Sequence, residues 1–192
     1  MKLYLKNHTE RYPVEQLQLQ LFAQEPSEFC TEPFTGDGTV SSLSRGKHFL
    51  TATAKVTYRG RTGFASNRVR LEDADVRATR RILQRSYYLA AVQVLDTAPP
   101  WGALSGVRPS KLSTKALLAG KTRRQAEREL EREFFVTPER AKLCVDASEH
   151  TVEAMNLLAS QMNELKKRDP HPKKDIIHKK ITPVLIKRDT CT

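Results

Sequence analysis

Basic side chains give the clearest spacing with a chemical meaning in this sequence. Arg77, Arg81 and Arg85 follow one another at intervals of four residues, and Arg80 lies beside them. Side chains at this spacing share one face of a helix, and a row of guanidinium groups can follow a phosphate backbone. The sequence therefore identifies these four arginines as candidate polyanion-binding residues, with a solvated helix face as the alternative.

A second segment, residues 99–112, combines an aromatic anchor with basic side chains. It reads Pro-Pro-Trp-Gly-Ala-Leu-Ser-Gly-Val-Arg-Pro-Ser-Lys-Leu and holds the only tryptophan of the chain. Arg108 precedes a proline, which favours an extended backbone, so its guanidinium is expected at the start of a helix. Trp101, Arg108 and Lys111 are therefore candidate ligand-binding or domain-interface residues. A packed connection between two helices is the alternative.

The other residue patterns give no complete active site. Gly36-Asp37-Gly38 lacks the third glycine and the Lys-Ser/Thr pair of a phosphate-binding loop. The five histidines are not at metal-ligand spacing, and the sequence has no Gly-x-Ser-x-Gly motif. Cys30, Cys144 and Cys191 are far apart, which argues against a disulfide framework and against a zinc site. The sequence therefore assigns no catalytic residue and no metal ligand.

The elements that must position the candidate residues follow an α+β pattern. Residues 2–8 predict a strand, residues 11–24 a helix, residues 25–38 a loop and residues 39–44 a further strand. Residues 50–58 alternate apolar and polar side chains, as in a strand with one buried face, and residues 61–69 are its partner across an Arg-Gly turn. Because one polar face favours antiparallel pairing, we expect a small, mainly antiparallel β-α-β-β-α sheet followed by a helical C-terminal half.

Helical signals dominate after the sheet. Asp73 is the expected cap of a helix that reaches residue 95, and residues 110–118 predict a short helix closed by a glycine. Thr122 and Gln125 have the spacing of a capping box, and Pro138 is placed to open the last helix. The chain is thus divided into an α/β accessory domain (1–98), a helical segment packed on it (99–165) and a basic tail (166–192), which we expect to be disordered.

The net charge of +11 at pH 7 is consistent with a basic protein that binds a polyanion or an acidic surface. A large part of this charge lies in residues 166–192, where a solvated segment is the alternative. No window approaches the roughly 18 apolar residues of a membrane span, and the N-terminal residues have no apolar core of a signal peptide. We therefore expect a cytoplasmic location and no membrane partner.

Residues 99–147 resemble a known family. The motif Trp-Gly-x-Leu-x-Gly-Val-Arg-Pro-x-Lys-Leu at 101–112 is followed by Gly-Lys-Thr at 120–122 and by Val-Thr-Pro-Glu-Arg-Ala-Lys-Leu at 136–143. It is similar to the connecting region of the oxygen-independent coproporphyrinogen III oxidase-like proteins, in the HemZ-type branch called coproporphyrinogen dehydrogenase, which belongs to the radical SAM enzymes. The resemblance implies an N-terminal accessory domain and a context of haem and porphyrin biosynthesis.

The sequence departs from this family where catalysis would begin. In the family, a radical SAM domain follows, and its Cys-x₃-Cys-x₂-Cys run holds a [4Fe–4S] cluster whose open iron binds S-adenosylmethionine. This sequence has no such run, so both cofactors would belong to an absent domain, and none is expected in this chain. The chain is then either a truncated form or a freestanding relative, and whether it is itself an enzyme stays open.

Two functions follow from these observations. The leading prediction is a non-catalytic N-terminal accessory module, or a truncated form, of a coproporphyrinogen III oxidase-like protein, with a separate or missing radical SAM domain as its partner. The alternative is a basic module that binds nucleic acid. If the first prediction is right, an exposed apolar patch should lie beside Arg108 and Lys111, because a lost interface leaves such a patch.

Overall fold

The computed structural model describes residues 1–105 and 108–168, with the side chains of 166–168 excluded. The chain divides into two units, Met1–Thr151 and Val152–Thr192. This division falls within the last helix, whereas the sequence analysis placed a boundary between residues 98 and 99. The expected tail at 166–192 lies outside the described residues, apart from the helical backbone that reaches Arg168.

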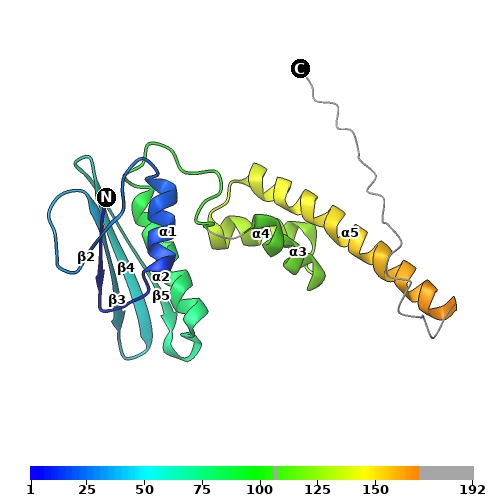
Figure 1. Cartoon of the computed structure of the whole chain (residues 1–192). Coiled ribbons are helices and arrows are strands. Elements are labelled where there is room, and N and C mark those ends of the chain that lie inside the picture. The colour runs from blue at the N-terminus through cyan, green and yellow to red at the C-terminus, as the bar shows by residue number, and fades with distance from the viewer. Residues whose placement is uncertain (106–107, 169–192) are drawn as a thin grey trace, which may run out of the picture. The chain divides into compact units, whose positions relative to one another are not determined.

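The first unit begins with a five-stranded sheet (Figure 1). Its strands are β1 (Lys2–Lys6), β2 (Glu28–Cys30), β3 (Gly38–Arg45), β4 (Phe49–Tyr58) and β5 (Arg61–Arg70), in the spatial order β2-β1-β3-β4-β5. β1 is parallel to β2 and β3, and the pairs β3-β4 and β4-β5 are antiparallel. The predicted α+β class is confirmed, but the sheet is mixed rather than mainly antiparallel. The reason is that a helix follows β1 and returns the chain to the end where β1 began, which leads to parallel pairing.

Strand β2 lies within the segment predicted to be a loop. It is three residues long and pairs in parallel with β1, and the backbone N–H of Glu28 donates to the carbonyl of Met1 at 3.1 Å. So short a strand has no alternation that a sequence pattern could reveal. The observed order β-α-β-β-β-β-α therefore contains one strand, β2, for which the sequence predicted no strand range.

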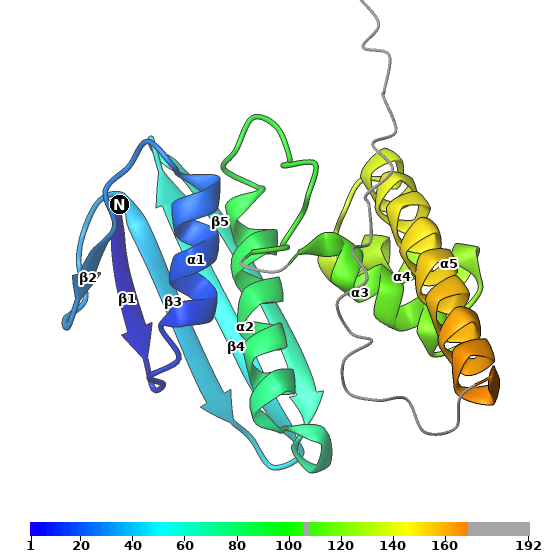
Figure 2. The same ribbon diagram turned by 45° about the vertical axis from the view of Figure 1, so that its right-hand side comes forward.

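Two helices cover one face of the sheet, α1 (Tyr12–Leu21) and α2 (Val76–Ala91), as Figure 2 shows. The predicted alternation in β4 is confirmed, because Ala52, Ala54 and Val56 are buried on the helix-covered face. The largest fully buried side chains of this core include Leu3, Val14, Leu17, Leu83 and Tyr87. Burial of this apolar surface, at roughly 25 cal/mol per Å², holds the helices to the sheet.

The start of α2 differs from the prediction by two residues. Asp73 was expected to cap this helix, but Leu71–Asp73 forms a single 3-10 turn, and the N–H of Leu71 donates to the carbonyl of His48 at 3.0 Å. Asp75 is the cap, since its carboxylate accepts from the N–H of Ala78 at 2.6 Å. The contact with His48 ties the 3-10 turn to the strand connection and moves the helix start.

The outer edge of β5 is closed by a side chain that follows α2. The Gln93 amide nitrogen donates to the carbonyl of Phe64 at 2.9 Å, and its amide oxygen accepts from the N–H of Phe64 at 3.1 Å. The approach is close because Gly63 has no side chain, and a Cβ there would overlap the carbonyl of Ala90. At Phe64, the Gln93 amide thus makes the two backbone hydrogen bonds that a neighbouring strand would make.

Three further helices follow, α3 (Pro109–Leu118), α4 (Arg123–Phe134) and α5 (Pro138–Arg168). The predicted capping box is confirmed: the Thr122 hydroxyl accepts from the N–H of Gln125, and the Gln125 side chain accepts from the N–H of Thr122. Arg123 then links α4 to α5 through ion pairs with Asp146 and Glu149. A second apolar cluster, which includes Leu104, Ala116, Leu130, Val136 and Val145, holds the three helices together.

The buried face of α5 is short. Ala141, Val145 and Ser148 are fully buried, but Met155 and Met162, which continue the same helical spacing, are 47% and 57% exposed. Packing of this face therefore ends near the boundary between the two units. Within the described residues, no helix is both long and apolar enough to cross a membrane.

Candidate functional site

The connecting segment forms a turn that is bonded to the junction between α4 and α5. The N–H of Ala103 donates to the carbonyl of Phe134 at 2.7 Å, and the N–H of Thr137 donates to the carbonyl of Pro100 at 3.0 Å. Gly102 sits between these bonds with φ +56°, and a Cβ there would overlap the backbone of Phe134 and Phe135. The motif therefore needs glycine at this position for both its backbone conformation and its close approach.

The structure separates the three candidate residues of this segment into two environments. Trp101 is half-buried against the second apolar cluster, with the Arg140 guanidinium 5.4 Å from the centre of its ring. Arg108 and Lys111 are exposed, at the N-cap and in the first turn of α3. Trp101 thus anchors the segment, whereas the two basic side chains are available to a ligand or a partner.

An apolar cleft lies beside this segment. It is lined by Trp101, Leu104, Pro109, Leu143 and Cys144, with Gln20, Ser110 and Ala147 completing the wall. Leu143 on α5 is 51% exposed although it is a large apolar side chain. The exposed cations Arg108 and Lys111 flank the lining residues 109 and 110 in sequence, although neither is itself a lining residue.

Two hydroxyl groups join α3 to α5. The Ser113 and Ser148 hydroxyls lie 2.7 Å apart, and Ser148 donates to the carbonyl of Ser110 at 3.0 Å and is within 2.9 Å of the carbonyl of Cys144. Burial raises the pKa of the Cys144 thiol. A protonated thiol is a poor nucleophile, so Cys144 acts as a packing residue.

The four arginines of the sequence prediction all belong to α2, and three of them contact other parts of the first unit. Arg80 pairs with Glu10 at 2.7 Å, and Arg81 lies 3.7 Å from the carboxylate of Glu133. Arg85 donates to the carbonyls of residues 132 and 133 at 3.0 and 3.2 Å. A cation near the last carbonyls of a helix interacts favourably with its dipole, so Arg85 caps the end of α4. Arg77 is exposed in the first turn of α2.

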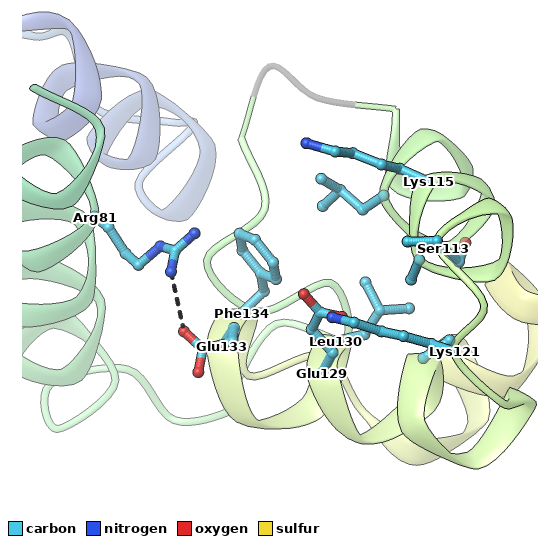
Figure 3. Close-up of a pocket in the computed structure, with 12 residues that line it drawn as sticks. Arg81, Ser113, Lys115, Lys121, Glu129, Leu130, Glu133 and Phe134 are labelled. Atoms are coloured by element: carbon cyan, nitrogen blue, oxygen red, sulfur yellow. Dashed lines mark hydrogen bonds and ion pairs between the residues drawn. The ribbon is translucent and has the colours of Figure 1, made fainter.

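A pocket of mixed charge lies between α2, α3 and α4 (Figure 3). Lys121 forms an ion pair with Glu129 at 2.5 Å, and Glu133 forms an ion pair with the guanidinium of Arg81 at 3.7 Å. These side chains neutralise one another, and the pocket's hydroxyl, from Ser113, is engaged with Ser148 and backbone carbonyls. The arrangement stabilises the junction of the three helices and provides no activated nucleophile.

Two further titratable side chains with shifted pKa values, those of His8 and Tyr87, contribute to the packing of the fold. His8 contacts the hydroxyl and the carbonyl of Ser41 at 3.2 and 3.3 Å, and burial lowers the pKa of its imidazole. Burial raises the pKa of the Tyr87 phenol, which lies in the core of the sheet. Among the residues that the structure describes, no three or more His, Cys, Asp or Glu side chains are grouped so that they could hold a metal ion.

The sequence analysis missed a second surface, on the uncovered face of the sheet. Phe49, Phe64 and Arg68 lie there, although residues 61–69 were predicted only as a partner strand. Residues two apart in a strand share one face. The register of the β4-β5 hairpin would therefore have placed these three side chains on the same face as the polar residues of 50–58.

A comparison of the chain with protein-family models, curated proteins and solved structures finds no match.

Proposed function

We propose that this chain acts as a non-catalytic accessory module of a HemZ-type, oxygen-independent coproporphyrinogen III oxidase-like protein. The observation that supports the proposal is the open apolar cleft beside residues 99–112, the segment that carries the resemblance. Such a cleft next to exposed cations is the surface expected where a partner domain docks. The proposal places the module in the cytoplasm, in a context of haem biosynthesis.

The partner in this proposal is a radical SAM domain that supplies the catalysis. This chain's own residues do not fit the cofactors of that domain, because its three cysteines are not arranged as Cys-x₃-Cys-x₂-Cys. Of the two cysteines described, Cys144 is buried and Cys30 lies in strand β2. The cluster and S-adenosylmethionine are therefore assigned to the partner, and this chain contributes recognition alone.

The two parts of the surface have different roles in docking. Leu143 and the edge of Trp101 would lose exposed apolar area on contact, which favours association at roughly 25 cal/mol per Å². Arg108 and Lys111 are exposed beside the cleft, and charges at the rim of an interface chiefly set orientation and association rate. Removing an apolar wall residue should therefore weaken binding more than removing either cation.

The proposal is tested by calorimetric titration of this chain with a radical SAM protein of this branch from which the N-terminal module has been removed. We expect a 1:1 complex, weakened at least about tenfold by Leu143→Asp, since an unpaired carboxylate is costly to bury. Leu118→Asp is the matched control, because Leu118 on α3 is also a leucine, 54% exposed, and does not line the cleft. Absence of binding, or equal weakening by both variants, would contradict the proposal.

A further inference from the structure

The five-stranded sheet has an open face. α1 and α2 lie on the opposite face (Figure 2), and no helix within the described residues covers this one. Residues directly paired across neighbouring strands point to the same side, so the register decides which side chains the open face carries. Thr51, Thr53 and Thr57 of β4 are among them, on the side away from the buried Ala52, Ala54 and Val56.

The open face is strongly basic. The register gives it five cationic side chains, Lys2, Lys6, Lys55, Arg68 and Arg70, and one carboxylate, Glu28, at its β2 edge. Arg70 also pairs with Glu72 at 3.1 Å, but both side chains are 69% exposed, and such surface pairs bind weakly. The charge of this face therefore complements an anionic partner.

Aromatic rings lie among these cations. Phe64 projects from β5 with 60% of its surface exposed, directly opposite Lys55. Phe49 is covered by the Arg68 guanidinium, whose central carbon lies 4.4 Å from the ring centre. A nucleic-acid base can stack on an exposed ring or on a guanidinium plane of this kind.

A hollow next to Phe64 adds depth to this face. Its walls include Phe34, Val40, Lys55 and Thr62. The Phe34 ring packs directly on Gly38, because a Cβ at this position would overlap the ring. A flat ring can enter such a hollow, with the Lys55 ammonium and threonine hydroxyls as polar neighbours.

We infer that this open sheet face binds single-stranded nucleic acid. The cations hold the phosphate backbone, and unpaired bases stack on Phe64 and on the Arg68–Phe49 pair. A duplex would not suit the surface, since its bases are already stacked and unavailable to rings on a flat sheet. From β1 to β5 there are three strand spacings of about 4.8 Å, so the face spans roughly 14 Å, enough for a few nucleotides.

The first experiment measures the anisotropy of a fluorescent oligothymidylate of about 16 nucleotides, the upper end of the site sizes of comparable sheet surfaces. Phe64→Ala should weaken binding by about 5- to 150-fold, the range for loss of one stacking ring. Tyr12→Ala is the matched control, because Tyr12 is 65% exposed on α1, on the opposite side of the sheet. Its affinity should equal that of the parent chain.

Salt dependence supplies the second readout. Lys55→Gln should reduce the slope of log affinity against log salt by about 0.7, the value for one phosphate contact on a single strand. Arg77→Gln on α2 should leave the slope unchanged. The inference is overturned if Phe64→Ala binds as tightly as the parent chain, because other basic residues would then hold the strand. Binding to vesicles containing phosphatidylserine without competition by the oligonucleotide would also overturn it, in favour of a lipid surface.

Discussion

Replacement of Gly102 by alanine tests how the connecting segment is held against the end of α4. Gly102 has φ +56°, and a Cβ there would meet backbone atoms of Phe134 and Phe135 rather than a flexible side chain. The backbone itself must therefore move. Gly120, with φ +81° and nothing within 4 Å of its virtual Cβ, offers a control with the same conformational requirement and no obstacle.

The expected loss in the free energy of unfolding follows from the surroundings of Gly102 and Gly120. Holding an alanine in the left-handed region costs about 1–2 kcal/mol, and the stiffer unfolded chain returns about 0.4–1 kcal/mol. Gly120→Ala should thus lower the free energy of unfolding by about 1 kcal/mol. Gly102→Ala should also disturb the bonds from Ala103 to Phe134 and from Thr137 to Pro100. At about 1 kcal/mol for each bond, the total is about 3 kcal/mol.

Urea unfolding followed by tryptophan fluorescence measures this difference, because the only tryptophan adjoins Gly102. With a typical slope of about 1–3 kcal/mol per molar urea, the Gly102→Ala midpoint should fall by about 1–3 M. Amide hydrogen exchange should become faster at Ala103 and Thr137 in this variant alone. If Gly102→Ala and Gly120→Ala are equally stable, the close backbone approach does not contribute, and the argument is refuted.

Three further outcomes are expected from buried polar groups. Ser148→Ala should lower the free energy of unfolding by about 1–2 kcal/mol in urea titrations, since its hydroxyl joins α3 to α5 and Ser113 keeps its carbonyl partners. Below its ordinary pKa of about 6.5, the His8 imidazole binds more protons in the unfolded chain than in the folded chain, because burial lowers its folded pKa. Stability should therefore fall as the pH drops through this value, and His8→Gln should remove that part of the slope in thermal scans. Cys144 should react more slowly than the partly exposed Cys30 with a thiol reagent, as mapped by peptide mass spectrometry, because it is buried and burial raises its pKa.

The sequence predicted those features of the fold that depend only on residues close together in the chain. The capping box at Thr122 and Gln125, the proline that opens α5 and the alternation of β4 each depend on a few neighbouring residues, and each is confirmed. Strand β2 was missed because its three residues gain their pairing only from β1, more than twenty positions earlier. The choice between Asp73 and Asp75 depended on the contact between Leu71 and His48, which no local pattern contains.

The candidate surfaces show the same limit. Helical spacing placed four arginines on α2, but the partners of Arg80, Arg81 and Arg85 come from distant segments and could not be read from that spacing. An apolar patch was predicted beside Arg108 and Lys111; the cleft includes their sequence neighbours Pro109 and Ser110, but neither cation is among its lining residues. On the open sheet face, Phe64 and Lys55 are known to be neighbours only once the register of the β4-β5 pair is fixed.

The contact between Gln93 and the edge of β5 also bears on how copies of this chain avoid one another. An exposed strand edge is a template for pairing with a second chain, and it can lead to aggregation. Here the amide of Gln93 occupies the N–H and carbonyl of Phe64, while β2 at the other edge offers only three residues. At one edge of the sheet, the Gln93 side chain thus occupies the backbone groups of Phe64. At the other edge, β2 is too short to pair with a strand of a second chain. Both features disfavour edge-to-edge association of copies.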